Sequence, residues 1–144
     1  MVHETGETIL EYELEDAVNT DWEALSGQWG PILYVGDIGD NYYVREEIKI
    51  YLLQEPLINP RIKVIPRDTY TALHLQYPDS LPHNAEALFV ESFPWPDNIY
   101  VITYNDPSEV FRVPAGLRDG QLGTLEYITS IPIPGITAAD MSKE

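Results

Sequence analysis

Three acidic residues recur in similar sequence surroundings and are the first candidates for chemistry. Glu23, Glu86 and Asp140 each lie in a short segment that combines a carboxylate with alanine and an apolar residue. The segments read Asp-Trp-Glu-Ala-Leu at 21–25, Asn-Ala-Glu-Ala-Leu at 84–88 and Thr-Ala-Ala-Asp-Met at 137–141. Carboxylates that converge from separate segments bind hard cations such as Ca²⁺ through oxygen. The pattern predicts a calcium site at these residues; the alternative is that the carboxylates only accept backbone hydrogen bonds at turns.

Polar residues flank two of these positions. Asp21 and Asn84 each lie two residues before the carboxylate of their segment, and His83 directly precedes Asn84. Histidine is the most frequent general base in enzymes, so His83 is the candidate catalytic residue beside such a site.

A second candidate for calcium is the stretch Asp-Ile-Gly-Asp-Asn at 37–41. Oxygen side chains spaced closely around a glycine can wrap Ca²⁺, which makes Asp37, Asp40 and Asn41 candidate ligands, although the spacing is not that of an EF-hand. The alternative is a tight turn, in which Asp and Asn are favoured and glycine supplies a positive φ. Pairing of Arg45 with Asp37 or Asp40 would make the stretch purely structural.

Short β-strands are the elements that must position these residues. Twelve prolines and nine glycines interrupt the chain at short intervals, which excludes long helices. Between them lie segments rich in β-branched and aromatic residues, as strands require. The expected strands are residues 8–14, 32–35, 48–53, 70–77, 99–104, 110–113 and 125–133. Residues 21–25 are expected to form a strand or a short turn, because Gly27 follows too soon for a helix.

The acidic segments begin successive copies of a repeat. After each of the first two come a loop, a strand with a Tyr-Val pair, a third strand with a basic residue and a proline, and a fourth strand. Repeats of about 40 to 50 residues with four strands are typical of β-propeller blades. The expected fold is all-β, with antiparallel four-stranded blades at 19–82 and 83–134. Residues 1–18 would be the last strand of a preceding blade, and 135–144 the start of the next. The alternative is two chance hairpins in a β-sandwich.

Two to three blades are too few for a closed ring, because a propeller needs about four to eight. The chain is therefore expected to be a fragment of a longer protein, to assemble in several copies, or to leave open sheet edges. Self-association follows from either of the last two.

Composition excludes several classes of partner and site. The net charge of −16, from 24 acidic and 8 basic residues, disfavours nucleic acid and anionic membranes. The absence of cysteine excludes disulfides, thiolate nucleophiles and cysteine zinc sites. No apolar run approaches the roughly 18 residues that span a membrane, and the N-terminus lacks the features of a signal peptide. The cellular compartment stays undetermined.

The segments at 21–25, 34–41, 83–88 and 137–141 resemble blade motifs of a group of poorly characterised bacterial β-propeller proteins. The most specific part is Gly-Asp-Ile-Gly-Asp-Asn at 36–41, followed by Arg45, whereas Ala24 and Leu25 depart from the pattern. Such proteins are described as WD40-like, and some are linked by name to esterase-like phytases. The resemblance implies the early-middle blades of a protein about twice as long. Similarly, some six-bladed propeller hydrolases and lactonases hold a channel calcium with Glu, Asn and Asp.

Two functions remain open from the sequence. The first is a binding or scaffold module, a propeller segment whose channel holds Ca²⁺. The alternative is a metal-dependent hydrolase of esters or phosphoesters, with Glu23, Glu86 and Asp140 as ligands and His83 as base. The sequence does not decide whether the chain is an enzyme, and it names neither a ligand nor a substrate.

Overall fold

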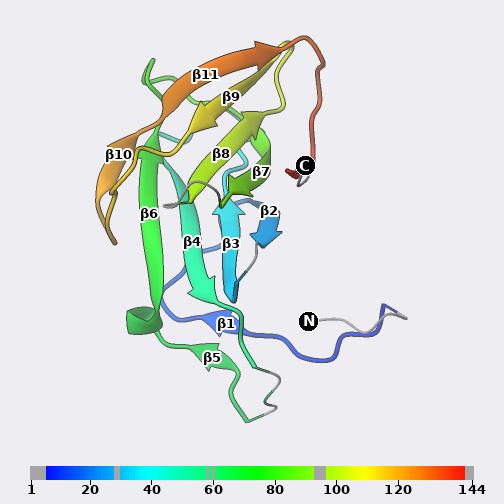
Figure 1. Cartoon of the computed structure of the whole chain (residues 1–144), viewed down its shortest axis with the longest axis vertical. Coiled ribbons are helices and arrows are strands. Elements are labelled where there is room, and N and C mark those ends of the chain that lie inside the picture. The colour runs from blue at the N-terminus through cyan, green and yellow to red at the C-terminus, as the bar shows by residue number, and fades with distance from the viewer. Residues whose placement is uncertain (1–5, 28–29, 58, 60, 93–96, 142–144) are drawn as a thin grey trace.

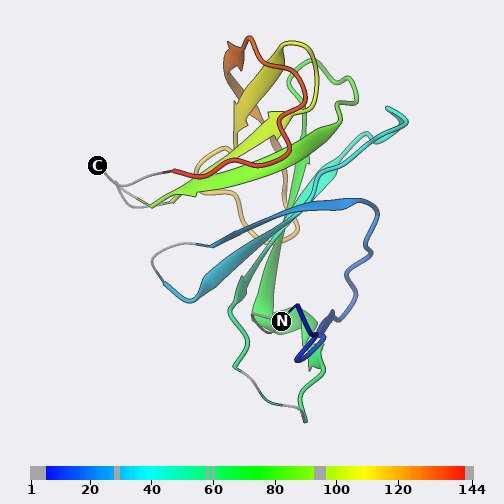
Figure 2. The ribbon, with the colours of Figure 1, turned by 90° about the vertical axis from the view of Figure 1, so that its right-hand side faces the viewer.

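The computed structural model describes residues 6–27, 30–57, 59, 61–92 and 97–141, and it is built from β-strands (Figure 1). Two antiparallel sheets lie one against the other, as the perpendicular view in Figure 2 shows. Within these residues no helix is long and apolar enough to cross a membrane, and the one helical element is the 3-10 turn η1, Arg67–Thr69.

The first sheet has five strands in the order β10-β6-β4-β3-β2. Four of them form an antiparallel meander, in which β2 pairs with β3, β3 with β4, and β4 with β6. The fifth, β10, comes from the later part of the chain and pairs with β6 in parallel. The strands are β2 (Trp22–Gly27), β3 (Ile32–Asp37), β4 (Ile48–Gln54), β6 (Tyr70–Gln76) and β10 (Leu122–Thr124).

The second sheet is a four-stranded antiparallel meander in the order β11-β9-β8-β7. Its strands are β7 (Ala85–Glu91), β8 (Asn98–Thr103), β9 (Ser108–Arg112) and β11 (Glu126–Ile131). A separate parallel pair joins β1 (Glu13–Leu14) to β5 (Val64–Ile65), which lies between β4 and β6 in the chain.

The main core lies between the two sheets. In β4, Ile48 and Ile50 point into it, whereas Tyr51 and Leu53 belong to a different cluster on the opposite face. This division follows from the alternation of side chains along a strand. The second sheet contributes Val101, which is fully buried, and its neighbours to the same core. Burial of apolar surface between the sheets, at roughly 25 cal/mol per Å², is the main force that holds them together.

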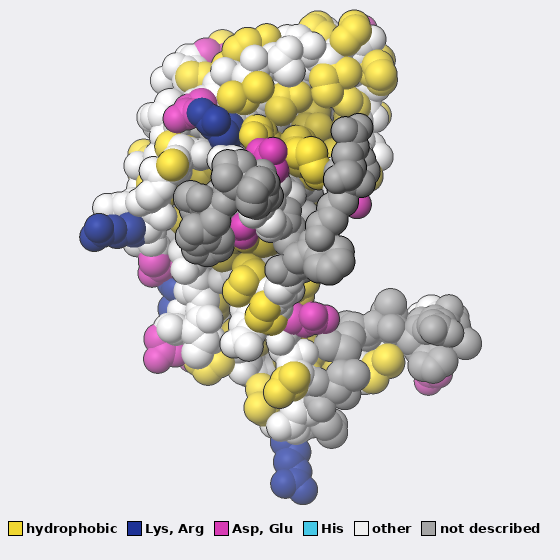
Figure 3. Space-filling model, viewed as in Figure 1, with side chains coloured by type: hydrophobic (Ala, Val, Ile, Leu, Met, Phe, Trp, Pro, Cys, Tyr) yellow, Lys and Arg dark blue, Asp and Glu magenta, His cyan; other side chains and the backbone are white. Residues whose placement is uncertain are grey.

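Each sheet also carries an apolar outer face. On the first sheet, Tyr51 and Leu53 pack with Leu14 of β1. On the second sheet, Ile102 packs with Ile136 of the C-terminal segment. Figure 3 shows hydrophobic side chains gathered over the upper part of the molecule, where the second sheet lies. The chain therefore has apolar surface on both sides of its two-sheet core.

The expected all-β, antiparallel fold is confirmed, and of the segment 21–25 all but Asp21 lies in the strand β2, one of the two expected alternatives. A closed ring of blades is not seen among the described residues. The strand expected at 8–14 is shorter, because only Glu13 and Leu14 form a ladder with another segment. β5 and β10 were not expected, since two or three residues are too few to show an alternating pattern.

Candidate functional site

The first strands of the two sheets, β2 and β7, lie side by side. Each contains a β-bulge: the pairing register shifts between Trp22 and Ala24 in β2, and between Ala85 and Ala87 in β7. Glu23 and Glu86 are the residues within these bulges. A bulge re-aims a side chain relative to the pleat of its strand. The two bulges thus fall at the two positions that the sequence pattern aligns.

The two glutamates belong to one polar cluster, which we call the inner-strand cluster: Asp21, Glu23, Asn41, Asn84 and Glu86. Asn41 Nδ2 donates to Asp21 Oδ2 at 3.0 Å, and Asn84 Nδ2 donates to Glu86 Oε1 at 3.2 Å. Burial, a hydrogen bond with Asp21, and the charges of Asp21 and Glu86 raise the pKa of the Glu23 carboxyl. Negative charge is therefore concentrated where the two sheets meet, which is an arrangement that a cation would stabilise.

Gly39 allows this cluster to form. A Cβ at this position would lie 2.5 Å from Asp21 Oδ2 and 2.8 Å from Glu23 Cγ, distances at which something must move. The Gly39 N–H also donates to the Asp21 carbonyl oxygen at 3.1 Å. The backbone after β3 and the carboxylates at the start of β2 thus pack closely because residue 39 has no side chain.

Asp37 is fully buried and pairs with Arg45. Its Oδ1 accepts from Arg45 Nη1 at 3.0 Å and from the Asp21 N–H at 2.9 Å. Arg45 also donates to the carbonyl oxygens of Gly39, at 2.7 Å, and Asp37, at 3.1 Å. Asp37 Oδ2 has no hydrogen-bond partner among the described residues. The pairing of Arg45 with Asp37, which the sequence offered as the structural alternative to a calcium loop, is confirmed.

Asp40 is buried, and its carboxylate accepts hydrogen bonds from the backbone of its own loop. Its two carboxylate oxygens accept from the Val44 N–H at 3.0 Å and the Arg45 N–H at 2.8 Å. Its own N–H donates to Asn84 Oδ1 at 2.7 Å, which ties the loop to the second sheet. Of the three ligands expected in this stretch, only Asn41 joins the inner-strand cluster.

His83 contacts two carboxylates that are not part of the inner-strand cluster. Its Nε2 is 2.9 Å from Asp79 Oδ2, and its Nδ1 is 3.6 Å from Glu109 Oε2. Its ring packs against Tyr77, with centroids 4.4 Å apart. Burial opposes ionisation of Asp79, but hydrogen bonds from the Leu81 N–H and His83 outweigh it and lower the pKa of the Asp79 carboxyl.

Asp140 is exposed, and its Oδ1 accepts from the N–H of Met141 at 2.8 Å. Its neighbours Ile136 and Ala139 pack on the outer face of the second sheet. Within the described ranges, no three His, Asp or Glu side chains are placed so that they could hold a metal ion. Of the three carboxylates expected to converge, the structure therefore brings together Glu23 and Glu86 only.

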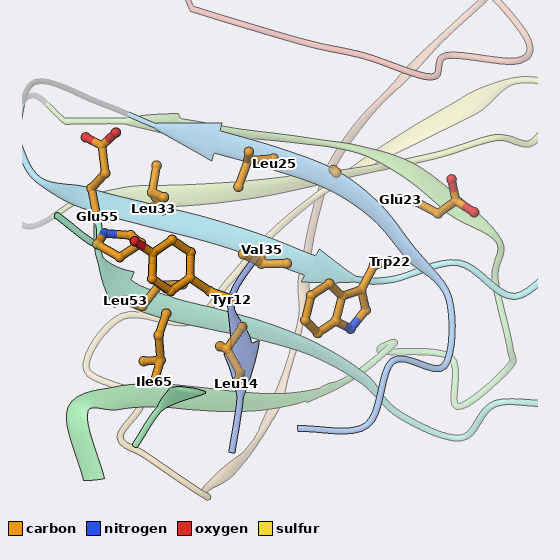
Figure 4. Close-up of a pocket in the computed structure, with 12 residues that line it drawn as sticks. Tyr12, Leu14, Trp22, Glu23, Leu25, Leu33, Val35, Leu53, Glu55 and Ile65 are labelled. Carbon is orange, nitrogen blue, oxygen red and sulfur yellow. The ribbon is translucent and has the colours of Figure 1, made fainter. Parts of the chain in front are cut away.

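An apolar hollow on the outer face of the first sheet was not expected. It has a volume of about 580 Å³, and ten of its twelve lining residues are apolar (Figure 4). Leu33 and Val35 alternate with Tyr34, which faces the main core. The signal available in the sequence was that β3 is apolar on both faces, which indicates that both faces are covered.

No known family model, curated protein or solved structure matches the chain.

Proposed function

We propose that the chain is a segment of a β-propeller and acts as a binding or scaffold module that packs against further blades. The observation that carries this proposal is the arrangement of the two meanders. They pack face to face, and their first strands, β2 and β7, lie side by side. In a propeller, neighbouring four-stranded blades pack in this way, and their first strands line the central channel.

Two further features support this proposal. The bulges at Glu23 and Glu86 give the two first strands the same local irregularity at aligned positions. The apolar outer faces of the two sheets provide surfaces on which neighbouring blades would pack.

Light scattering tests the proposal directly. A chain with uncovered apolar sheet faces should associate, so we expect a concentration-dependent mass above the 16.4 kDa of one chain. Phe89→Glu and Tyr100→Glu, which place charges in a stacked aromatic pair beside the outer face of the second sheet, should shift the mass toward that of the monomer. Glu126→Gln, an exposed carboxylate on β11, is the control. A strictly monomeric mass with a cooperative melt would contradict the proposal.

We further propose that the inner-strand cluster binds Ca²⁺ in the channel of the assembled propeller. Carboxylates and side-chain amides of the two sheets and of the loop after β3 meet there. Burial, together with the charges of Asp21 and Glu86, raises the pKa of the Glu23 carboxyl, and a cation would offset those charges. Calcium takes six to eight oxygen ligands, so other blades would complete the coordination.

Calorimetry with Ca²⁺ tests this second proposal. Because only part of the ligand set is present, we expect weak binding, with a Kd of about 10⁻⁴–10⁻³ M. Glu23→Gln and Glu86→Gln should each weaken it about tenfold, whereas Asp68→Asn, which removes an exposed carboxylate from η1, should not. The absence of any saturable heat with the unmodified chain would rule out a calcium site in it.

The alternative of a metal-dependent ester or phosphoester hydrolase has less support. It needs a base beside the metal, and His83 instead contacts Asp79 and Glu109 and packs on Tyr77. Binding rather than catalysis is therefore the function that the geometry favours.

A further inference from the structure

The apolar hollow on the first sheet lies beside β1 and has the form of an unfilled packing surface. β3 contributes Leu33 and Val35, β2 contributes Trp22, and β1 contributes Leu14. Figure 4 shows these side chains on one face of the sheet, with Glu55 and Glu23 at opposite ends. Leu25, at its edge, is 68 % exposed. Small-molecule sites have a few polar groups that converge on the ligand, whereas ten of the twelve residues that line this hollow are apolar and its two carboxylates lie at its ends.

The two short parallel pairs, β1 with β5 and β10 with β6, have corresponding places in the two sheets. β10 directly precedes the fourth strand of the second sheet, β11, and pairs in parallel with the fourth strand of the first sheet, β6. β5 has the corresponding place in the first meander, because it precedes that meander's fourth strand, β6. It pairs in parallel with β1. By this correspondence, β1 occupies the same position relative to the first sheet as β6 occupies relative to the second sheet: each is the strand of a neighbouring sheet to which the short strand pairs.

Side-chain packing supports this correspondence. Leu73 and Leu75 of β6 pack into the core that the second sheet shares. Leu14 of β1 packs in the same way on the first sheet, with Leu53, Tyr70 and the partly buried Ile65 of β5. Backbone hydrogen bonds on both sides of Leu14 hold β1 in place: Glu13 N–H donates to the Lys63 oxygen at 2.8 Å, and Glu15 N–H to the Ile65 oxygen at 3.0 Å.

The difference lies on the other edge of each strand. On that edge β6 is followed in its sheet by β4, β3 and β2, and these three strands pack over the second sheet. β1 pairs with β5 alone among the described residues, and the hollow lies where three such strands would pack. We propose, on the basis of the propeller function proposed above, that the hollow receives a three-stranded antiparallel β-meander. This meander pairs with β1, which becomes its fourth strand.

The chemistry of the occupant follows from the lining. It is a β-segment with an apolar face against Trp22, Leu33 and Val35, and with a strand edge that hydrogen-bonds to β1. Strands lie about 4.8 Å apart, so three of them cover the width of the three strands, β2 to β4, that line most of the hollow. A second copy of the chain fits less well, because its second sheet already has a fourth strand, β11, which would compete with β1 for the same place.

A fusion tests the proposal with residues 8–144 of the chain. The probe is a second copy of residues 19–56, which contains β2 to β4, joined ahead of Thr8 by a Gly/Ser linker of 15 residues. The natural connection 55–69 between β4 and β6 has 15 residues, and residues 8–12 lengthen the fused connection to β1 further, so it can span the same distance. These strands are chosen because they follow β6 in its sheet, as the proposed occupant would follow β1 in a sheet of its own. Trp29 and Trp95, and both tryptophans of the added copy, are replaced by phenylalanine. Trp22 in the hollow is then the sole tryptophan and reports its surroundings.

We expect the Trp22 emission to shift to shorter wavelength and the Tm to rise by roughly 5 °C relative to the unfused chain carrying the same Trp→Phe changes. The matched control is the fusion with Leu33→Asp and Val35→Asp in the hollow, whose folding without the fusion is checked by circular dichroism. That control should lose both effects. An intact fusion with unchanged emission and Tm overturns the proposal, and so do equal effects in the Asp variant. Because the test is independent of self-association, an association without a response in the fusion removes this inference and leaves the scaffold proposal standing.

Discussion

At the scale of single residues, Arg45 is the side chain on which the loop after β3 depends. It neutralises Asp37, which is fully buried, and it also satisfies two carbonyl oxygens of the same loop. A buried carboxylate that loses its partner keeps the cost of its desolvation without the compensating attraction. The loop in turn positions Gly39 and Asn41 against the inner-strand cluster.

We therefore predict that Arg45→Ala lowers the free energy of unfolding by about 3 kcal/mol. Arg112→Ala is the matched control, because Arg112 pairs with Glu126 on the surface and such pairs contribute about 0–1 kcal/mol. Urea denaturation followed by circular dichroism measures both. Equal losses in the two variants would show that the Arg45–Asp37 pair contributes no more than a surface ion pair.

At the scale of elements, β10 connects the two sheets. It leaves the second meander and pairs with β6 of the first. Asp119, just before it, accepts from the Ala72 N–H and from Arg67 Nη2, both at 2.8 Å. These two interactions, of which the first is the larger, lower the pKa of the Asp119 carboxyl in spite of its slight burial. The ionised carboxylate thus holds the start of β10 against β6.

We predict that Asp119→Ala lowers the free energy of unfolding by about 1 kcal/mol at pH 7, since the group is half exposed and screened by water. A lowered pKa in the folded state means that this stabilisation is complete above the unfolded value, about 3.9, and is lost as the pH falls through the folded value. The difference from the unmodified chain should therefore shrink as the pH falls below the unfolded value and disappear once the carboxyl of Asp119 is protonated in the folded chain. Thermal melts across this range measure it, with Asp68→Ala on η1 as control. A difference that persists unchanged at low pH would mean that the charge of Asp119 is not responsible.

At the scale of the whole molecule, two sheets share one core and each has a second apolar face. The net charge of −16 favours solubility and opposes close approach of copies, especially at low salt. Association through the apolar faces should therefore strengthen as salt screens this repulsion. Light scattering at increasing NaCl concentration tests this, because the measured mass should rise with salt if the apolar faces drive association. The mass would fall with salt if attraction between opposite charges held the copies together.

The sequence alone determined the longer strands of the two sheets. The alternation in 70–77 places Leu73, Leu75 and Tyr77 on one face, and all three are buried in the main core, because successive side chains of a strand point to opposite faces. It also marked Glu23, Glu86 and Asn84, since the first strands repeat a local pattern. The pairing of Arg45 with Asp37 could also be anticipated, as one of two alternatives, because the partners are only eight residues apart in the sequence.

Only the tertiary structure decided how distant segments meet. Asp140 carries the same local pattern as Glu86, yet it lies exposed on the outer face of the second sheet, because convergence of carboxylates depends on the placement of whole sheets. His83 likewise finds Asp79 and Glu109. The parallel pairs of β1 with β5 and of β10 with β6 join strands of two or three residues, which have no periodicity of their own. Their hydrogen bonds form only once the sheets bring them together, and that is why the sequence showed the longer strands but not the hollow beside β1.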